Sequence, residues 1–256
     1  MTTELQLVNN ALSKIAQPPI TALADDVERA RLATRLWATV RDATLGDYDW
    51  NFALKRAVLS QNTQSITSIT RVTTTATATK TAHGYATNDF IRISGANEAP
   101  YNGLFQITVT SSSVFTYVMA SDPGGSATGT LLAAPGPAFE FSYQYSLPSD
   151  CVRVVKNNDN TAKWKVEGRY LLTDSASAVK ILYVFKETTV DNFDSSFVEA
   201  MATRLAAEMA IPLTGNANVS AGMWQLYANK IKETRSNDLR EESAYTQDND
   251  TLTSVR

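Results

Sequence analysis

The sequence predicts an α+β protein in which helices from the two ends of the chain form one bundle and β structure lies between them. Apolar residues recur every three to four positions near both ends, which is typical of amphipathic helices. At about Ser65 the composition changes, because SITSITRVTTTATATKT is rich in β-branched residues and almost uncharged, which favours strands. Pro135-Gly136-Pro137 marks the end of this region. We therefore expect a helical bundle with a β hairpin or sheet and an inserted small all-β domain.

Composition narrows the class of protein. The 256 residues suffice for one or two domains, and only 19% are charged, which is below the average for globular domains. The net charge of −3 disfavours tight binding to nucleic acid phosphates. Cys151 is the only cysteine, so no disulfide within the chain is expected, and we recognise neither a signal segment nor a membrane span. These features predict a soluble protein made in the cytoplasm, and the shortage of charges hints at assembly with partners.

Two helices are expected before residue 50. The first, in ELQLVNNALSKIAQPP, is stopped by Pro18 and Pro19, because the residue before a proline is pushed out of the α region. The second starts near Asp25 and Asp26, whose carboxylates suit the positive end of a helix dipole, and stops near Gly46. The residues expected to face the core are Leu5, Val8, Leu12, Ile15, Ala33, Leu36, Trp37, Val40 and Thr44.

Extended structure is expected from residue 50 to the end of the central region. Trp50 and Phe52 alternate as they would on one side of an extended segment. NDFIRISG alternates apolar residues around Arg92, and GLFQITVTSSSVFTYVMA predicts two strands around a turn at Ser111–Ser113. DPGGSATGT is expected to be a turn rather than a phosphate-binding loop, because no lysine and hydroxyl residue follow it.

β structure is expected to continue after the linker and to give way to two helices. FEFSYQYSLP alternates four aromatic residues from Phe139 to Tyr145, and KWKVEGRYLLTD with AVKILYVFKE predicts a hairpin. SSFVEAMATRLAAEMAIP opens with Ser196 and Glu199 at capping-box spacing. Pro212 and Gly215 are expected to end that helix. A final helix is expected from about Val219 to Glu242, and the inward-facing residues of the two are Phe197, Met201, Leu205, Met223, Leu226, Tyr227 and Ile231.

Four parts of the chain are therefore predicted. Residues 1–64 form the first part of the bundle, and 65–134 form the inserted all-β module. Residues 135–242 hold the β hairpin region and the helices that complete the bundle. Residues 243–256 form a polar C-terminal arm, which is expected to be disordered by itself.

Signals for catalysis or for a metal site are missing from the sequence. His83 precedes Gly84 in AHGY, and glycine can adopt the positive φ of a turn, so a structural turn is favoured over a general base or a metal ligand. One histidine and one cysteine supply no cluster of ligands. The carboxylate pairs Asp25–Asp26, Glu241–Glu242 and Asp248–Asp250 lie at a helix start or in polar C-terminal sequence. We expect neither enzyme activity nor a cofactor.

Arg29, Arg31 and Arg35 lie among acidic residues of the second helix. This pattern favours a solvated helix face with local ion pairs, and a contact between subunits is the alternative.

The two flanks of the chain resemble a phage protein family. VNNALSKIAQPPITAL, an Asp- and Arg-bearing helix and DYDWNF are similar to the N-terminal signature of the tail tubular protein A group, the head-to-tail adaptors (connectors) of tailed bacteriophages best known in podoviruses. In DNFDSSFVEAMATRLAAEMA, an aromatic and a basic residue seven positions apart recur as Phe197 and Arg204, and TLTSVR resembles the family's C-terminal tail. The matching N-terminal residues are Val8, Asn9, Leu12, Ile15, Pro18, Pro19, Ile20, Leu23, Trp50 and Phe52.

The resemblance covers residues 3–62 and 139–256. Shorter family members lack residues 65–134, and this stretch resembles a β module of phage virion proteins in AHGY, IRISG, YNG and FTY. Its ends, near Ser65 and Ala134, must lie close together to leave the bundle undisturbed.

The resemblance implies a virion structural protein at the head–tail interface. Such adaptors form a ring, usually of twelve subunits, below the portal, connect the capsid to the tail and form part of the DNA ejection channel. The implied partners are further copies of the chain, the portal protein, a downstream nozzle or tail-tube protein and tail fibres. DNA passes through without specific binding, and no membrane is contacted. The C-terminal arm is expected to bind the portal, and its proposed contact residues are Tyr245, Leu252, Val255 and Arg256.

A different class of function remains as the alternative. The Thr- and Tyr-rich β segment is also compatible with a tail-associated glycan-binding module, or adhesin, that recognises a host surface.

Overall fold

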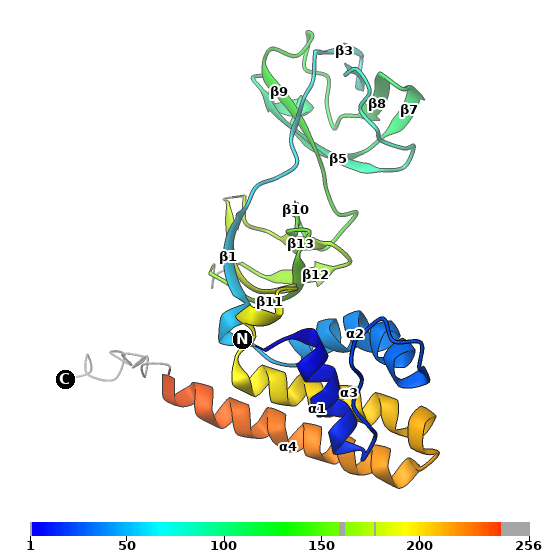
Figure 1. Cartoon of the computed structure of the whole chain (residues 1–256). Coiled ribbons are helices and arrows are strands. Elements are labelled where there is room, and N and C mark those ends of the chain that lie inside the picture. The colour runs from blue at the N-terminus through cyan, green and yellow to red at the C-terminus, as the bar shows by residue number, and fades with distance from the viewer. Residues whose placement is uncertain (1, 159–161, 177, 242–256) are drawn as a thin grey trace, which may run out of the picture. The chain divides into compact units, whose positions relative to one another are not determined.

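The computed structural model describes residues 2–158, 162–176 and 178–241, and Figure 1 shows that it contains both helices and antiparallel sheets. The mixed α+β class predicted from the sequence is therefore confirmed. The chain divides into two compact units. The first joins the N-terminal residues up to Leu54 to the residues from Val184 onwards, and the second is Lys55–Tyr183.

The first unit is built around one helix. Its helices are α1 (Glu4–Lys14), α2 (Glu28–Asp47), α3 (Ser195–Thr214) and α4 (Ala217–Glu241), and α3 packs against the other three. A helix that is apolar on most sides belongs in a core, and most side chains of α3 are apolar and buried, with Glu199, Arg204 and Glu208 as its charged residues. Its buried residues are Phe197, Ala200, Met201, Ala202, Thr203, Leu205, Ala206, Ala207, Met209 and Ala210.

Several predicted helix ends differ from the structure. α2 begins at Glu28, and the Asp25 carboxylate instead accepts hydrogen bonds from the backbone N–H groups of Thr21 and Ala22, closing a turn before the helix. The capping-box prediction at Ser196 was wrong. Asp194 caps α3, and its Oδ1 accepts a 2.6 Å hydrogen bond from the Phe197 N–H.

The end of α3 also differs in detail from the prediction. Pro212 lies inside the helix and does not stop it. The helix ends at Gly215, whose φ of 65° is left-handed, and the Gly215 N–H donates to the Ile211 carbonyl at 2.9 Å. Glycine adopts this conformation at little cost, so it supplies the stop that the proline does not.

An aromatic cluster fills the space beside the start of α3. Residues Asn51–Ala53 form a short 3-10 turn, which corrects the extended segment predicted there. The turn brings Trp50 to 5.0 Å and Phe52 to 5.1 Å from the Phe197 ring, measured between ring centroids. Trp50 is fully buried, and its indole N–H donates to the Thr44 carbonyl at 2.9 Å, so its polar atom is satisfied as burial requires.

The second unit contains four sheets. Two have three strands, in the orders β1-β14-β11 and β10-β13-β12, and two have four, in the orders β2-β9-β5-β6 and β3-β4-β8-β7. The strands are β1 (Leu54–Leu59), β2 (Gln64–Ser65), β3 (Ser68–Val72), β4 (Thr75–Thr79), β5 (Phe90–Ala96), β6 (Gly103–Gln106), β7 (Thr108–Ser111), β8 (Val114–Val118), β9 (Gly129–Pro135), β10 (Tyr143–Ser146), β11 (Cys151–Asn157), β12 (Trp164–Glu167), β13 (Tyr170–Thr173) and β14 (Val179–Phe185).

The predicted hairpin has different partners in the structure. KWKVEGRYLLTD is itself a hairpin, because β12 and β13 pair around the two-residue loop Gly168-Arg169, with Glu167 opposite Tyr170. Gly168 has a φ of 56°, as the first position of such a loop demands. β14 joins the other three-stranded sheet, between β1 and β11. β9 begins at Gly129, inside the DPGGSATGT stretch that was expected to be a turn, and Phe139, expected to alternate with the aromatic residues after it, lies outside any strand.

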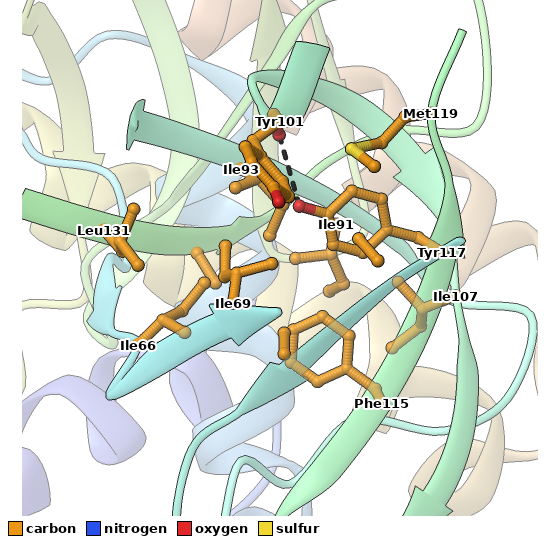
Figure 2. Close-up of a cluster of buried hydrophobic side chains, with 13 residues drawn as sticks. Ile66, Ile69, Ile91, Ile93, Tyr101, Ile107, Phe115, Tyr117, Met119 and Leu131 are labelled. Atoms are coloured by element: carbon orange, nitrogen blue, oxygen red, sulfur yellow. Dashed lines mark hydrogen bonds between the residues drawn. The ribbon is translucent and has the colours of Figure 1, made fainter. Parts of the chain in front are cut away.

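The two four-stranded sheets share one hydrophobic core, drawn in Figure 2. Ile69, Ile91, Ile107 and Phe115 point toward one another there, and every member of the cluster comes from residues 66–133. Figure 2 also shows the Tyr117 hydroxyl donating to the buried carbonyl of Tyr101, at 3.3 Å.

The ends of this segment meet in the sheet. Gln64 of β2 lies opposite Ala133 of β9, and Ser65 lies opposite Leu132. The expected proximity of the two ends is confirmed by this antiparallel register.

Candidate interaction surfaces

His83 makes the contacts of a structural residue. It is 3% exposed, and its Nδ1 accepts a 3.0 Å hydrogen bond from the Tyr85 N–H. The proton therefore resides on Nε2, which donates to the Ser111 carbonyl at 3.0 Å. The ring stacks on Tyr85 and meets Phe115 edge-on. With Gly84 at a φ of 73°, these contacts make the turn that the sequence predicts.

The other chemical patterns have structural explanations where the structure describes them. Asp26 forms an ion pair with Arg31. Asp122, in the glycine-rich DPGGSATGT, pairs with Arg71 at 2.8 Å and accepts from the Gly124 N–H, which closes the loop. Cys151 is buried, and burial raises the pKa of its thiol, which makes it a poor nucleophile.

Neither a metal cluster nor a membrane helix occurs in the described parts. Within residues 2–158, 162–176 and 178–241, three or more histidine, cysteine or carboxylate side chains nowhere gather as metal ligands. In the same ranges, no helix is both long enough and apolar enough to cross a membrane. The predicted portal-binding residues Tyr245, Leu252, Val255 and Arg256 lie outside the described residues, as do Glu242, Asp248 and Asp250.

One face of the β1-β14-β11 sheet carries an open groove with a volume of about 320 Å³. Four of its eight lining residues are apolar and three are cationic. The residues of this basic groove are Arg56, Ala57, Val58, Lys156, Asn158, Lys180, Ile181 and Leu182. Val58 is 61% exposed, and the three cations make neither an ion pair nor a side-chain hydrogen bond with any described residue. The groove thus presents apolar surface together with positive charge that no described acidic residue pairs with.

Strand alternation explains why the cations of this sheet differ in their pairing. Neighbouring residues of a strand point to opposite faces. Lys55, next to Arg56, forms a 3.0 Å ion pair with Asp150, and the Tyr183 hydroxyl donates to the same carboxylate. Burial, and then the charge of Asp150, raise the pKa of Tyr183 to about 12. The acidic partner therefore lies on the face opposite the groove.

A second surface of the same unit carries an exposed aromatic residue. Phe139 is 79% exposed, in the loop between β9 and β10. Its neighbour Glu140 has a φ of 69° and forms no ion pair with any described residue. The loop is anchored from the next two residues, because Phe141 is buried and the Ser142 N–H donates to Asp174 at 3.0 Å. We name Phe139 and Glu140 the Phe139 knob.

The surroundings of the knob are apolar and weakly acidic. A pocket of about 250 Å³ lies beside it, and its lining includes Glu167, Tyr170 and Leu172. Lys165 pairs with Glu167 at 2.7 Å, and Glu140 also interacts electrostatically with that lysine. Large exposed apolar side chains that cluster on a surface mark contact sites for other proteins.

Arg204, which carries part of the family resemblance, has a structural role within the first unit. It donates to Asp47 at the end of α2 and to the Tyr227 hydroxyl of α4, and its guanidinium lies 5.5 Å from the centre of the Trp224 ring. Three helices thus meet at this side chain.

Sequence reasoning missed both the basic groove and the Phe139 knob. Arg56, Lys156 and Lys180 come from three strands that are far apart in the chain, and only the sheet order brings them together. The available signal was a cation within an apolar strand, in LKRAVL and AVKIL. The chain matches no protein-family model, and no curated protein is significantly similar to it.

Proposed function

We propose that this protein is a virion structural protein, a head-to-tail adaptor that assembles as a ring below the portal of a tailed phage. The ring would connect the capsid to the tail and form part of the DNA ejection channel. One observation carries the proposal. The residues at both ends of the chain that resemble tail tubular protein A, among them Val8, Leu12, Trp50 and Phe197, are buried in a single compact unit.

The proposal includes a finer description of the fold. The helices of the two ends form one bundle, and residues 65–134 are a β module inserted into an adaptor core. The closed register of Gln64 with Ala133 supports this description, because both ends of the module leave at one place. A core made only from residues 66–133 supports it as well.

A ring role fits the surface chemistry of the described residues. A ring of identical subunits needs two different patches on each subunit, so that one patch meets the other on the next copy. The basic groove and the Phe139 knob are two such patches. With about twelve subunits, a net charge of −3 per chain would repel passing DNA from the wall.

The partners follow from this location. The ring would contact the portal protein above, a nozzle or tail-tube protein below and tail fibres at its side, inside the virion. We assign portal binding to the C-terminal arm that follows α4. Tyr245, Leu252 and Val255 are its apolar anchors, and such segments order on binding.

Imaging of purified portal–tail assemblies tests the location. Density for this chain in a ring at the collar between capsid vertex and tail is expected, and density for it at any other place would exclude the adaptor role. Deleting residues 244–256 tests the arm. The shortened chain should fold and lose affinity for isolated portal rings, while replacement of Asp248 and Asp250 by Asn keeps the anchors and serves as the control.

A tail-associated glycan-binding component, or adhesin, is the second candidate, and one observation favours it. Thr70, Thr77, Thr116 and Thr108 lie opposite one another across β3, β4, β8 and β7 and form a row of hydroxyl groups on the outer face of that sheet. Hydroxyl groups donate and accept hydrogen bonds as sugars do. Binding of the free protein to host cells or polysaccharide, abolished by Thr77→Val with Thr116→Val, would support this role over the adaptor.

A further inference from the structure

We propose that the Phe139 knob of one copy of this chain inserts into the basic groove of the next copy. The inference rests on the proposed ring and names the chemistry of its subunit contact. It commits to a second copy of the same chain as the occupant of the groove.

The shapes and polarities of the two surfaces match. An apolar cavity of about 150 Å³ accommodates a benzene ring, so the groove of about 320 Å³ has room for the Phe139 ring and for the group beside it. The ring would lie on Val58 and Leu182, which by strand alternation share the face of Arg56 and Lys180. Phe139 is 79% exposed in the single chain, so the chain's own groove does not hold it.

The charges match as well. No described acidic residue forms an ion pair with Arg56, Lys156 or Lys180. Likewise, no described basic residue lies at ion-pair distance from Glu140. Placing the Phe139 ring on the groove floor brings the Glu140 carboxylate to its cationic rim. Opposite charges that meet across an interface set its register and its choice of partner.

The connectivity of the two surfaces leads to a ring. The knob lies between β9 and β10, whereas the groove is built from β1, β11 and β14, and the two share no residue. Each copy therefore keeps one free knob and one free groove after its first contact. Such a heterologous contact continues until the chain of copies closes.

Nucleic acid is the alternative occupant of the basic groove, because the groove's three cations would also attract phosphate groups. The apolar floor favours the protein partner, because phosphate groups gain nothing from Val58 or Leu182. DNA binding therefore serves as an outcome of the test.

Self-association of the full chain, measured by sedimentation velocity and mass photometry, tests the contact. Phe139→Ala should weaken self-association about thirtyfold, as loss of an interface hot spot does. Lys180→Glu should weaken it about tenfold, through loss of attraction and gain of repulsion. The matched controls are Val72→Ala and Lys232→Glu, which change exposed residues elsewhere and should leave association unchanged.

A mixing experiment separates this contact from any other. The groove variant Lys156→Glu/Lys180→Glu and the knob variant Phe139→Ala/Glu140→Lys should each remain monomeric. Mixed together, they retain one intact knob and one intact groove, so they should form one-to-one dimers and no larger species. Association of either variant alone, or no dimer in the mixture, would overturn the proposal.

Cross-linking supplies a readout that does not depend on these variants. A photo-reactive benzoylphenylalanine at position 139 should cross-link to peptides containing residues 56–58 or 180–182 of an isotopically distinct copy. Cross-links only to other sites, or DNA binding that Lys180→Glu abolishes while association persists, would overturn the contact. Portal binding is measured separately. If the chain binds portal but never self-associates, the proposed contact is wrong and the adaptor role stands. If it self-associates through this contact but does not bind portal, the contact stands and the adaptor role is wrong.

Discussion

Tyr227 of α4 donates a 2.7 Å hydrogen bond to Oδ2 of Asp47, the last residue of α2. Arg204 of α3 donates to the same oxygen, so one carboxylate joins three helices that come from both ends of the chain. The Tyr227 ring is buried below the guanidinium, with 5.3 Å between the Arg204 Cζ and the ring centre. These hydrogen bonds connect α2 to α3 and α4, which lie more than a hundred residues further along the chain.

Stability at high pH should depend on Tyr227. Burial, and then its hydrogen bond to Asp47, raise the pKa of Tyr227 to about 12. An unfolded tyrosine titrates at about 10, so the contribution of the neutral hydroxyl is fully present below pH of about 10 and is lost as the pH rises through about 12. Tyr227→Phe should lower the free energy of unfolding by about 1 kcal/mol at neutral pH. The difference from the wild type should then shrink across that window.

Urea unfolding followed by helical circular dichroism, repeated at increasing pH, measures this effect. Tyr170→Phe changes an exposed tyrosine and is the control. A constant difference between Tyr227→Phe and the wild type at every pH would contradict the assignment.

The cap of α3 can be tested against the alternative that the sequence suggests. Asp194→Ala removes the side chain that bonds the Phe197 N–H, and it should lower stability by about 1 kcal/mol. Ser196→Ala, which removes the residue of the predicted capping box, should have little effect. Urea unfolding of both variants measures the two changes in stability. A larger loss of stability for Ser196→Ala than for Asp194→Ala would restore the cap assignment made from the sequence.

Gly95 should tolerate no side chain. It sits in the irregular pairing of β5 with β9 at a φ of 81°, and an added Cβ would lie 1.9 Å from the Thr130 carbonyl oxygen. Gly95→Ala should therefore destabilise the module by about 3 kcal/mol or more, since strain and a backbone clash combine. Gly124→Ala is the control, because Gly124 has a φ of 83° with open space around it and should cost only about 1 kcal/mol.

Amide hydrogen exchange, measured on peptides from β5 and β9, reports this loss locally. Equal protection of those peptides in the two glycine variants would show that the close approach of Thr130 is not limiting.

Excision of the module should leave the helical unit intact. Replacing residues 65–134 with a short Gly-Ser linker removes a complete core, and the neighbouring positions of Gln64 and Ala133 let the linker close the gap. The helical circular dichroism of the remaining chain and its unfolding midpoint should match those of the full chain. Inserting the same linker after Gly124 is the control. An insoluble product, or loss of the helical signal, would show that the module is integral to the fold.

The sequence by itself determined the type of most elements. Periodicity predicted the helices α1 and α3, because their apolar repeats are long and local, although the cap of α3 and the role of Pro212 differ from the prediction. Gly84 and Gly215 marked positions with positive φ angles. The sequence also predicted strands after Ser65, since β-branched residues without charges favour strands, and β3 and β4 lie there. His83 was expected to be a structural residue, and its ring bonds the Tyr85 N–H and the Ser111 carbonyl.

Tertiary structure decided which elements pair and which residues meet. The sequence predicts β12, β13 and β14 as strands. Their pairing partners, however, depend on cross-strand packing that no local pattern encodes. Whether Phe139 would be buried like Phe141 was equally open, because alternation predicts a face only for residues that are in a strand. The basic groove exists only because the sheet order places Arg56, Lys156 and Lys180 on one face. Distances between residues remote in the chain arise from packing of the whole unit, and for that reason they are settled only when it folds.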